Sequence, residues 1–195
     1  IDEIRAALGG GPAYEIIYVD DGSTDATLGM LKDLADKIPE LRVLRHVACC
    51  GQSAAIWTGV RAAKAPVIAT LDGDGQNDPA DIPALVAKYN EEGGGERVMI
   101  AGLRAKRRDT YIRRLSSRVA NGIRSGLLRD DTPDTGCGLK VFPRQAFLDF
   151  PRFDHMHRFM PALMLRLGGR VLSVPVNHRP RERGTSKYGV WNRLW

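Results

Sequence analysis

The hydrophobic positions along the chain fall into short apolar runs separated by stretches with helical spacing. Apolar runs rich in Val, Ile and Leu are typical of strands buried in a sheet. Between two such runs, Leu28, Leu31, Leu34, Ala35 and Ile38 recur at i, i+3, i+6, i+7 and i+10, which is typical of an amphipathic helix. The pattern predicts strands at 14–19, 41–44, 67–71 and 97–101, and helices at 2–8, 28–38, 52–63 and 81–89.

This alternation of strands and helices predicts an α/β fold. The order β-α-β-α-β-α-β implies a mostly parallel central sheet with helices on both faces. After residue 101 the pattern changes, and no internal repeat or low-complexity linker is present, so we interpret residues 1–195 as a single domain. In this second half we predict a helix at 111–128, a polar loop at 129–138, a strand at 140–142, a helix at 157–167 and a strand at 171–176.

Two of the predicted strands end in acidic residues. The segment Asp72-Gly73-Asp74-Gly75-Gln76 follows one strand, and Asp20-Asp21-Gly22 follows another. In parallel sheets, ligands bind in the crevice beyond the carboxyl ends of the strands. Carboxylates at i and i+2 with glycines around them can turn toward one hard cation, and Mg²⁺ or Mn²⁺ held this way keeps open positions for phosphates. The sequence therefore predicts a metal-dependent site for a phosphorylated substrate.

Each acidic segment also has a simpler interpretation. Asp72 and Asp74 could form a solvated acidic turn, although the preceding buried strand makes this less favourable. A calcium loop is excluded, because Asn77 stands where that loop needs glycine and Pro83 where it needs glutamate. The segment 20–25 could be only a turn and a helix cap, and its residue types fit that interpretation as well as they fit a nucleotide contact.

The composition adds a basic surface to this picture. The formal net charge is +6 and the pI is about 9.5, with the basic residues gathered at 104–129 and 179–193, which indicates an anionic partner. The charge is not accompanied by a helix-turn-helix, a zinc finger or an aromatic RNA-binding strand, so we expect no nucleic-acid partner. The segment Arg181-x-x-Gly184-x-Ser186-Lys187 suits a phosphate or pyrophosphate, with a solvated basic tail as its alternative.

The cysteines and histidines add little to this prediction. Cys49, Cys50 and Cys137 form neither a disulfide framework nor a zinc spacing, which favours a reducing, cytosolic setting. We do not expect Cys137 to be a nucleophile. His155 and His157 have no third ligand nearby, so we do not expect a metal there. The polar side chains of His46 and His178 are interpreted as structural. No apolar run approaches the length of about 20 residues that spans a bilayer.

Four segments together resemble a known family. They are Asp20-Asp21-Gly-Ser-Thr-Asp25, Asp72-Gly-Asp-Gly-Gln76, Asp134-Thr-Gly-Cys-Gly-Leu-Lys140 and Arg181-x-x-Gly-x-Ser-Lys187. In order and spacing they resemble family 2 glycosyltransferases of the GT-A fold. Within that family the resemblance is to the polyprenyl-phosphate group, which includes dolichol-phosphate mannosyltransferase and bacterial undecaprenyl-phosphate sugar transferases. A Q-x-x-R-W motif, found in the processive synthases of the family, is absent.

The resemblance implies a role for each matching residue. Asp20 or Asp21 would contact the donor nucleotide, and Asp72, Asp74 and Gln76 would hold Mg²⁺ or Mn²⁺ at the donor diphosphate. Asp74, Asp134 and Arg181 would be catalytic, with Asp134 either orienting the acceptor or acting as a base. Arg104 would bind the donor. The residues expected to contact acceptor or phosphate groups are Arg113, Ser117, Lys140, Ser186 and Lys187.

The implied reaction is inverting transfer of a sugar from GDP-mannose or a UDP-hexose to dolichyl or undecaprenyl phosphate at the cytoplasmic membrane face. The family's first strand, with its V-I-P-x-Y-N-E-type segment, is not in the sequence, so we expect a domain without that strand. The aromatic residues of 191–195 suit an interfacial helix, and many relatives continue into membrane helices. A soluble, non-processive transferase acting on a saccharide and a non-catalytic nucleotide-sugar-binding module stay as alternatives.

Overall fold

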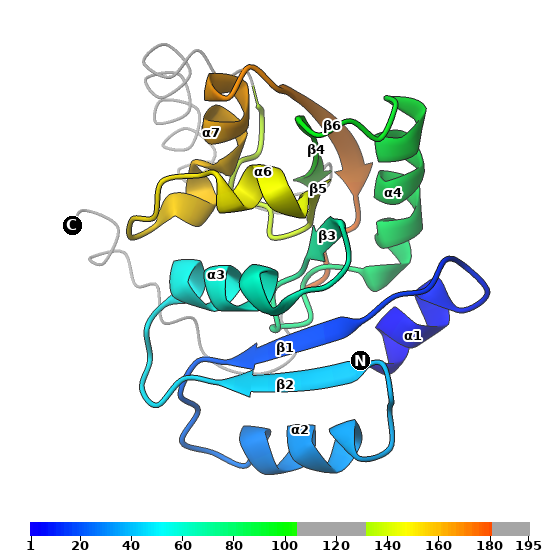
Figure 1. The fold of residues 1–195 in the computed structure, drawn as a ribbon. Coiled ribbons are helices and arrows are strands. Elements are labelled where there is room, and N and C mark those ends of the chain that lie inside the picture. Colours follow the sequence, from blue (N-terminus) through cyan, green and yellow to red (C-terminus); the bar gives the residue numbers. More distant parts are fainter. Residues whose placement is uncertain (105–131, 181–195) are drawn as a thin grey trace.

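The computed structural model describes residues 1–104 and 132–180 of the chain (Figure 1). The described helices are α1 (Asp2–Leu8), α2 (Thr27–Ala35), α3 (Gln52–Ala62), α4 (Ile82–Glu91), α6 (Arg144–Leu148) and α7 (Met160–Arg166), with short 3-10 turns η1 (Pro79–Asp81) and η2 (Met156–Arg158). The described strands are β1 (Ile16–Asp20), β2 (Leu41–Arg45), β3 (Val67–Thr70), β4 (Val98–Arg104), β5 (Lys140–Pro143) and β6 (Arg170–Val176).

These strands form two sheets rather than the single, mostly parallel sheet that the sequence predicted. β1 and β2 pair in parallel, with Ile16 opposite Leu41. The larger sheet has the order β3-β5-β4-β6, in which β4 and β6 are parallel and β5 is antiparallel to both of its neighbours. The residues before β5 already show this reversal. The segment that enters it runs back beside β4, where the Gly102 N–H donates to the Leu139 carbonyl at 2.9 Å. An apolar run such as 140–142 carries no information about strand direction.

Helices cover both faces of the four-stranded sheet, as the sequence predicted. Side chains alternate along the strands, so Phe142 and Met99 pack on one face while Val141 and Ile100 pack on the other. The first face is covered by α6 and α7 and the second by α4 (Figure 1).

The β1–β2 sheet has its own small core and is linked to the rest through α3. Ile16, Ile38 and Leu41 form this core, and the side chains of Leu34 and Ala35 on α2 pack against it. Helix α3 lies between the two sheets in Figure 1 and packs against both β1 and α6. Its Gly59 faces the Val19 side chain, since a Cβ there would lie 3.4 Å from the nearest methyl group. The lack of a side chain at Gly59 therefore lets β1 approach α3 closely.

Most of the predicted elements are present close to their predicted bounds. Helix α6 was not predicted, because five residues carry too little periodicity to be recognised. The predicted helix at 157–167 is divided into η2 and α7, with Pro161 in the first turn of α7. The predicted helix at 111–128 lies outside the described residues. Within residues 1–104 and 132–180, every helix is too short or too polar to cross a bilayer.

Candidate active site

Asp72 stands just beyond β3 and is fixed by contacts from three parts of the chain. Its Oδ1 accepts a hydrogen bond of 2.6 Å from Nε2 of Gln52 at the start of α3. Its backbone N–H donates to Oδ1 of Asn77 at 3.1 Å. Gly138 lies against its other oxygen, so closely that a Cβ at position 138 would overlap Asp72 Oδ2. The carboxylate therefore has one well-defined position at the strand end.

The environment of Asp72 opposes a negative charge. Burial raises the pKa of its carboxyl above the ordinary value, and the charge of Asp74 raises it further. The charges of Lys140 and Arg104 act in the opposite direction without cancelling this effect. Two carboxylates in a partly desolvated site repel each other, and a divalent cation between them would remove that repulsion.

The donor atoms around Asp72 fit a hard cation. Asp74 Oδ1 accepts from the Gln76 N–H at 3.1 Å, which turns the segment 72–76 back on itself. Carboxylate and amide oxygens are the ligands that Mg²⁺ and Mn²⁺ prefer. The residue types at Asp72, Asp74 and Gln76 and the raised pKa of Asp72 are thus compatible with the predicted metal site.

Arg104 and Asp134, which were predicted for different roles, form one ion pair. Arg104 Nε and Nη2 each lie 2.7 Å from a different oxygen of the Asp134 carboxylate. The Arg104 N–H also donates to Asp134 Oδ2 at 3.3 Å. Such a two-point contact fixes the plane of the guanidinium. Asp134 therefore determines how Arg104 is oriented at the end of β4.

Lys140 lies beneath this ion pair. The residue is only 4% exposed, and its Nζ donates to the backbone carbonyls of Thr135 and Cys137. Burial lowers the pKa of the ammonium group. These contacts hold Lys140 against the 135–137 loop, and its contact with phosphate stays a prediction.

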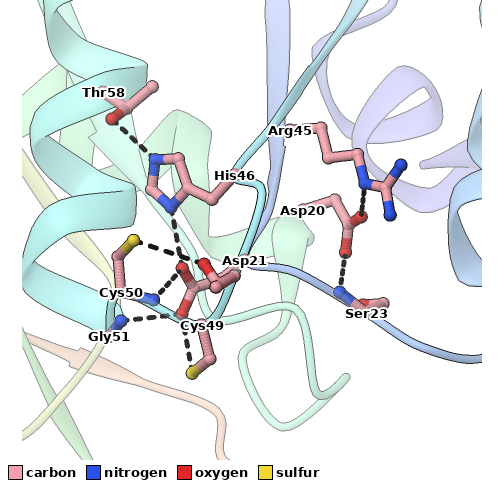
Figure 2. A network of polar contacts seen from close by, with 10 residues as sticks. Asp20, Asp21, Ser23, Arg45, His46, Cys49, Cys50, Gly51 and Thr58 are labelled. Atoms are coloured by element: carbon pink, nitrogen blue, oxygen red, sulfur yellow. Dashed lines mark hydrogen bonds and ion pairs between the residues drawn. The ribbon is translucent and has the colours of Figure 1, made fainter.

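The two acids at the end of β1 differ in their surroundings (Figure 2). Asp20 is 2% exposed, its Oδ1 accepts from the Ser23 N–H at 3.1 Å, and Arg45 Nε lies 3.8 Å from its Oδ2. Asp21 accepts hydrogen bonds from the loop between β2 and α3. These come from His46 Nδ1 at 2.7 Å, Cys50 N at 2.8 Å, Gly51 N at 2.8 Å and Cys49 Sγ at 3.2 Å.

Burial acts to raise the pKa of Asp21, but the hydrogen bonds outweigh it and lower the pKa to about 2. Asp21 is thus an ionised anchor for residues 46–51. The sequence predicted a nucleotide contact for Asp20 or Asp21, and the structure adds this anchoring contact for Asp21.

The start of α3 connects the two acidic strand ends. The Gly51 N–H donates to Asp21, and the next residue, Gln52, donates to Asp72. The two segments at the ends of β1 and β3 are therefore joined through two adjacent residues. Sequence reasoning missed Gln52, because a lone polar side chain in the first turn of a helix carries no signal of its partner.

Residues 178 and 179, just before the predicted phosphate-binding segment 181–187, lie beside Gln76 and Asn77. Asn77 and His178 form an isolated antiparallel bridge, and the Arg179 N–H donates to the Gln76 carbonyl at 2.9 Å. Arg179 is also held by ion pairs to Asp78 at 2.7 Å and Glu3 at 2.8 Å. The predicted site residues that lie outside the described part of the chain are Arg113, Ser117, Arg181, Ser186 and Lys187.

A cavity of about 430 Å³ lies beside the start of α3. It is lined by Cys50, Ser53, Ala54, Arg152, Phe153, Asp154 and Met156. The Arg152 guanidinium is 5.7 Å from the centroid of the Trp57 ring, which holds this cationic side chain against α3. The sequence analysis assigned no functional role to any of these lining residues, since segment 152–156 has no recognisable motif.

The histidines at 155 and 157 differ in their surroundings, since His155 is exposed and His157 is half-buried. His157 Nδ1 lies 2.8 Å from Ser53 Oγ, and burial, with the nearby charge of Arg158, lowers the pKa of the ring to about 4. His157 is therefore a neutral link between η2 and α3.

Solved structures with this fold define the class of the domain. Glucosyl-3-phosphoglycerate synthase from Mycobacterium tuberculosis, in complex with Mn²⁺, UDP-glucose and phosphoglyceric acid, has a TM-score of 0.63 at 20% identity, covering 93% of this chain and 67% of that chain. The same enzyme with UDP, Mn²⁺ and glucosyl-3-phosphoglycerate gives 0.64 at 19% identity, covering 92% and 65%. The described domain therefore has the GT-A fold.

The chain belongs to glycosyl transferase family 2, whose family model matches residues 1–150. It is 35% identical over 195 residues to dodecaprenyl-phosphate galacturonate synthase of Rhizobium johnstonii, covering 97% of this chain and 57% of that relative. It is 34% identical over 182 residues to undecaprenyl-phosphate 4-deoxy-4-formamido-L-arabinose transferase of Edwardsiella ictaluri, covering 92% of this chain and 54% of that relative. The chain thus spans little more than half the length of these relatives. The predicted membership of family 2 is confirmed, and the two relatives are named as transferases or synthases of polyprenyl-phosphate sugars.

Proposed function

We propose that this chain carries the catalytic site of an inverting glycosyltransferase, which moves a sugar from a nucleotide-diphosphate donor to a polyprenyl phosphate. The observation that carries the proposal is the partly buried Asp72 carboxylate beside Asp74, held at the end of β3 by Gln52 and Gly138. The relatives named for dodecaprenyl and undecaprenyl phosphate support this acceptor class. A UDP-hexose or GDP-mannose is the donor class that we assign.

Asp72, Asp74 and Gln76 would hold Mg²⁺ or Mn²⁺. The bound cation would neutralise the charge that develops on the leaving diphosphate. The chain holds the oxygens of these ligands in fixed positions. Gln52 fixes one oxygen of Asp72, and the Gln76 N–H fixes one oxygen of Asp74. The raised pKa of Asp72 favours occupation of the site, because a cation relieves the unfavourable burial of this carboxylate.

Arg104 would contact a donor phosphate, with Asp134 as its positioning residue. Both carboxylate oxygens of Asp134 accept from the Arg104 guanidinium, which makes Asp134 poorly suited to remove a proton. We therefore assign Asp134 the orienting role rather than that of a base. An acceptor phosphate is already ionised at neutral pH and needs no strong base to become a nucleophile. Lys140 supports the loop that carries Asp134, and Arg181, Ser186 and Lys187 would bind phosphate from the other side.

A polyprenyl-phosphate acceptor implies that the reaction takes place at a membrane surface. The net charge of +6 agrees with attraction to an anionic surface, and we place the site at the cytoplasmic face. This assignment follows from the chemistry of the acceptor class and from the charge of the chain.

The experiment that tests the proposed function compares the wild-type chain with Asp74→Asn. Sugar transfer from each of several labelled nucleotide sugars to undecaprenyl or dolichyl phosphate is measured with Mg²⁺ or Mn²⁺ present. We expect the variant to lose transfer by at least about 100-fold, since it removes a charged ligand of the metal. Its circular dichroism spectrum and thermal unfolding should match the wild type. Near-normal turnover in this folded variant would refute the metal role.

A further inference from the structure

A second group of metal-binding side chains lies on the loop between β2 and α3. One ligand atom from each of Asp21, His46 and Cys50 lies within 4.8 Å of the others. Carboxylate oxygen, imidazole nitrogen and thiolate sulfur together favour a thiophilic divalent ion such as Zn²⁺ over the hard cations expected at Asp72. The side chains of Asp21 and His46 are half-buried and that of Cys50 is exposed, so an ion can reach the group from solvent.

The imidazole of His46 is held in the orientation that a metal ligand needs (Figure 2). Its Nε2 lies 2.9 Å from Oγ1 of Thr58 on α3, and its Nδ1 faces the Asp21 carboxylate at 2.7 Å. Metal-ligating histidines usually bond a second polar group through the nitrogen that does not bind the metal, which fixes the ring and its tautomer. Thr58 occupies that position here, so Nδ1 is the nitrogen available to a cation.

Asp21 is also prepared for this role. Backbone N–H groups of Cys50 and Gly51 hold it in place at 2.8 Å each. These backbone contacts do not involve the Cys50 thiol, which donates to the Ala48 carbonyl at 3.2 Å. A thiol held only by one exposed carbonyl can turn toward an ion at little cost.

We propose that Asp21, His46 Nδ1 and Cys50 Sγ bind one Zn²⁺ ion, with a water as fourth ligand. On binding, the Cys50 thiol releases a proton to solvent, the proton on His46 Nδ1 is replaced by one on Nε2 that is donated to Thr58 Oγ1, and the metal replaces the hydrogen bond between His46 and Asp21. Bond lengths of about 2.0 to 2.3 Å in a tetrahedral site require donor atoms roughly 3.3 to 3.8 Å apart. His46 and Asp21 would therefore separate by only about 1 Å.

This site is distinct from the predicted oxygen site at Asp72, Asp74 and Gln76. The two share no ligand, and their donor atoms select different ions. Excess Mg²⁺ can therefore saturate one site while Zn²⁺ is titrated into the other. The binding measurement needs neither a sugar donor nor a lipid, so its result is independent of the proposed transfer reaction.

The test titrates the chain with Zn²⁺ against a chromogenic chelator in excess Mg²⁺, and separately with Co²⁺, whose absorption reports thiolate ligands. We expect one Zn²⁺ per chain and a thiolate-to-cobalt charge-transfer band. Thr58→Val should weaken Zn²⁺ binding about 10- to 100-fold by releasing the imidazole. Cys50→Ser should weaken it by more than that and remove the band.

Cys49→Ser is the matched control, because it removes the neighbouring exposed thiol and leaves the three proposed ligands intact. It should keep the thiolate band and bind Zn²⁺ within about 10-fold of the wild type. The buried Cys137 stays unchanged in all variants. Thermal unfolding without metal shows that each variant is folded. Absence of a thiolate band in the wild type, or equal Zn²⁺ affinity in Cys50→Ser, would overturn the proposal and leave the group as a hydrogen-bonded anchor only.

Discussion

Asp72 illustrates how a single carboxylate can cost stability in return for function. Its pKa is raised because burial and the charge of Asp74 both oppose ionisation. The folded protein therefore binds a proton more readily at this residue than the unfolded chain does. By linkage, the stability contributed at this position falls as the pH rises from the unfolded pKa through the folded pKa, and it stays reduced at neutral pH.

We accordingly expect Asp72→Asn to raise the melting temperature of the metal-free protein at pH 7 while it abolishes sugar transfer. An asparagine keeps an oxygen that can accept a hydrogen bond from Gln52 and removes the partly buried charge. Differential scanning calorimetry in a chelator measures the change, with the exposed Asp33→Asn on α2 as control. A lower melting temperature for Asp72→Asn than for Asp33→Asn would show that the charge of Asp72 does not destabilise the metal-free protein.

Gly138 is required by the close approach of Asp72. A Cβ at position 138 would overlap Asp72 Oδ2 and lie 2.8 Å from Asn77 Oδ1. We expect Gly138→Ala to destabilise the protein by about 1 to 3 kcal/mol, as overpacking typically does, and to lower transfer because Asp72 is displaced. Urea denaturation measures the free energy of unfolding.

Gly29 on α2 offers the control for this substitution. A Cβ there meets nothing within 4 Å, so Gly29→Ala should stabilise the chain by about 0.5 to 1 kcal/mol through helix propensity. Equal effects of the two substitutions would show that the space around Gly138 is not as restricted as the structure indicates.

At the scale of elements, α3 is the part that brings the site together. Its first residues contact both acidic strand ends, and its Ser53 is bonded to His157 on η2. The sequence predicted the bounds of α3 and the acids at the strand ends, because apolar periodicity and strand termination are local properties. The contacts of Gln52 and Ser53 join residues far apart in the chain, and no local pattern encodes them.

The link between His157 and α3 makes stability depend on pH. Burial lowers the pKa of His157 to about 4, so between about pH 6.5 and pH 4 the unfolded chain binds a proton that the folded protein does not. Stability at this position is therefore complete above pH 6.5 and decreases as the pH falls toward 4. We expect His157→Asn to flatten this dependence in thermal unfolding measured from pH 7 to pH 4.5.

The neighbouring His155 gives the matched control. Its side chain is exposed, and its φ of 62° is one that asparagine tolerates. His155→Asn should keep the wild-type dependence on pH. If both variants showed the same profile as the wild type, the titration of His157 would not be the cause of the acid sensitivity.

At the scale of the whole molecule, the α/β class, the family and most elements followed from the sequence, but the arrangement of strands did not. The division into two sheets and the reversal of β5 depend on which strands find each other, and apolar runs do not specify partners. The candidate site shows the same limit. The sequence identified the acids at 20, 21, 72 and 74 as candidate site residues. The ion pair between Arg104 and Asp134 and the hydrogen bonds that anchor Asp21 were visible only in the folded structure.

The phase into which the labelled sugar passes after transfer shows which acceptor has received it. The chain is incubated with a labelled nucleotide sugar, Mg²⁺ or Mn²⁺, and undecaprenyl phosphate, and the mixture is divided between organic solvent and water. We expect the label to enter the organic phase, and we expect this to require the lipid, the divalent cation and the Asp74 side chain. Label that reaches only a water-phase saccharide product, or metal-dependent donor binding without any turnover across the panel of nucleotide sugars, would contradict it.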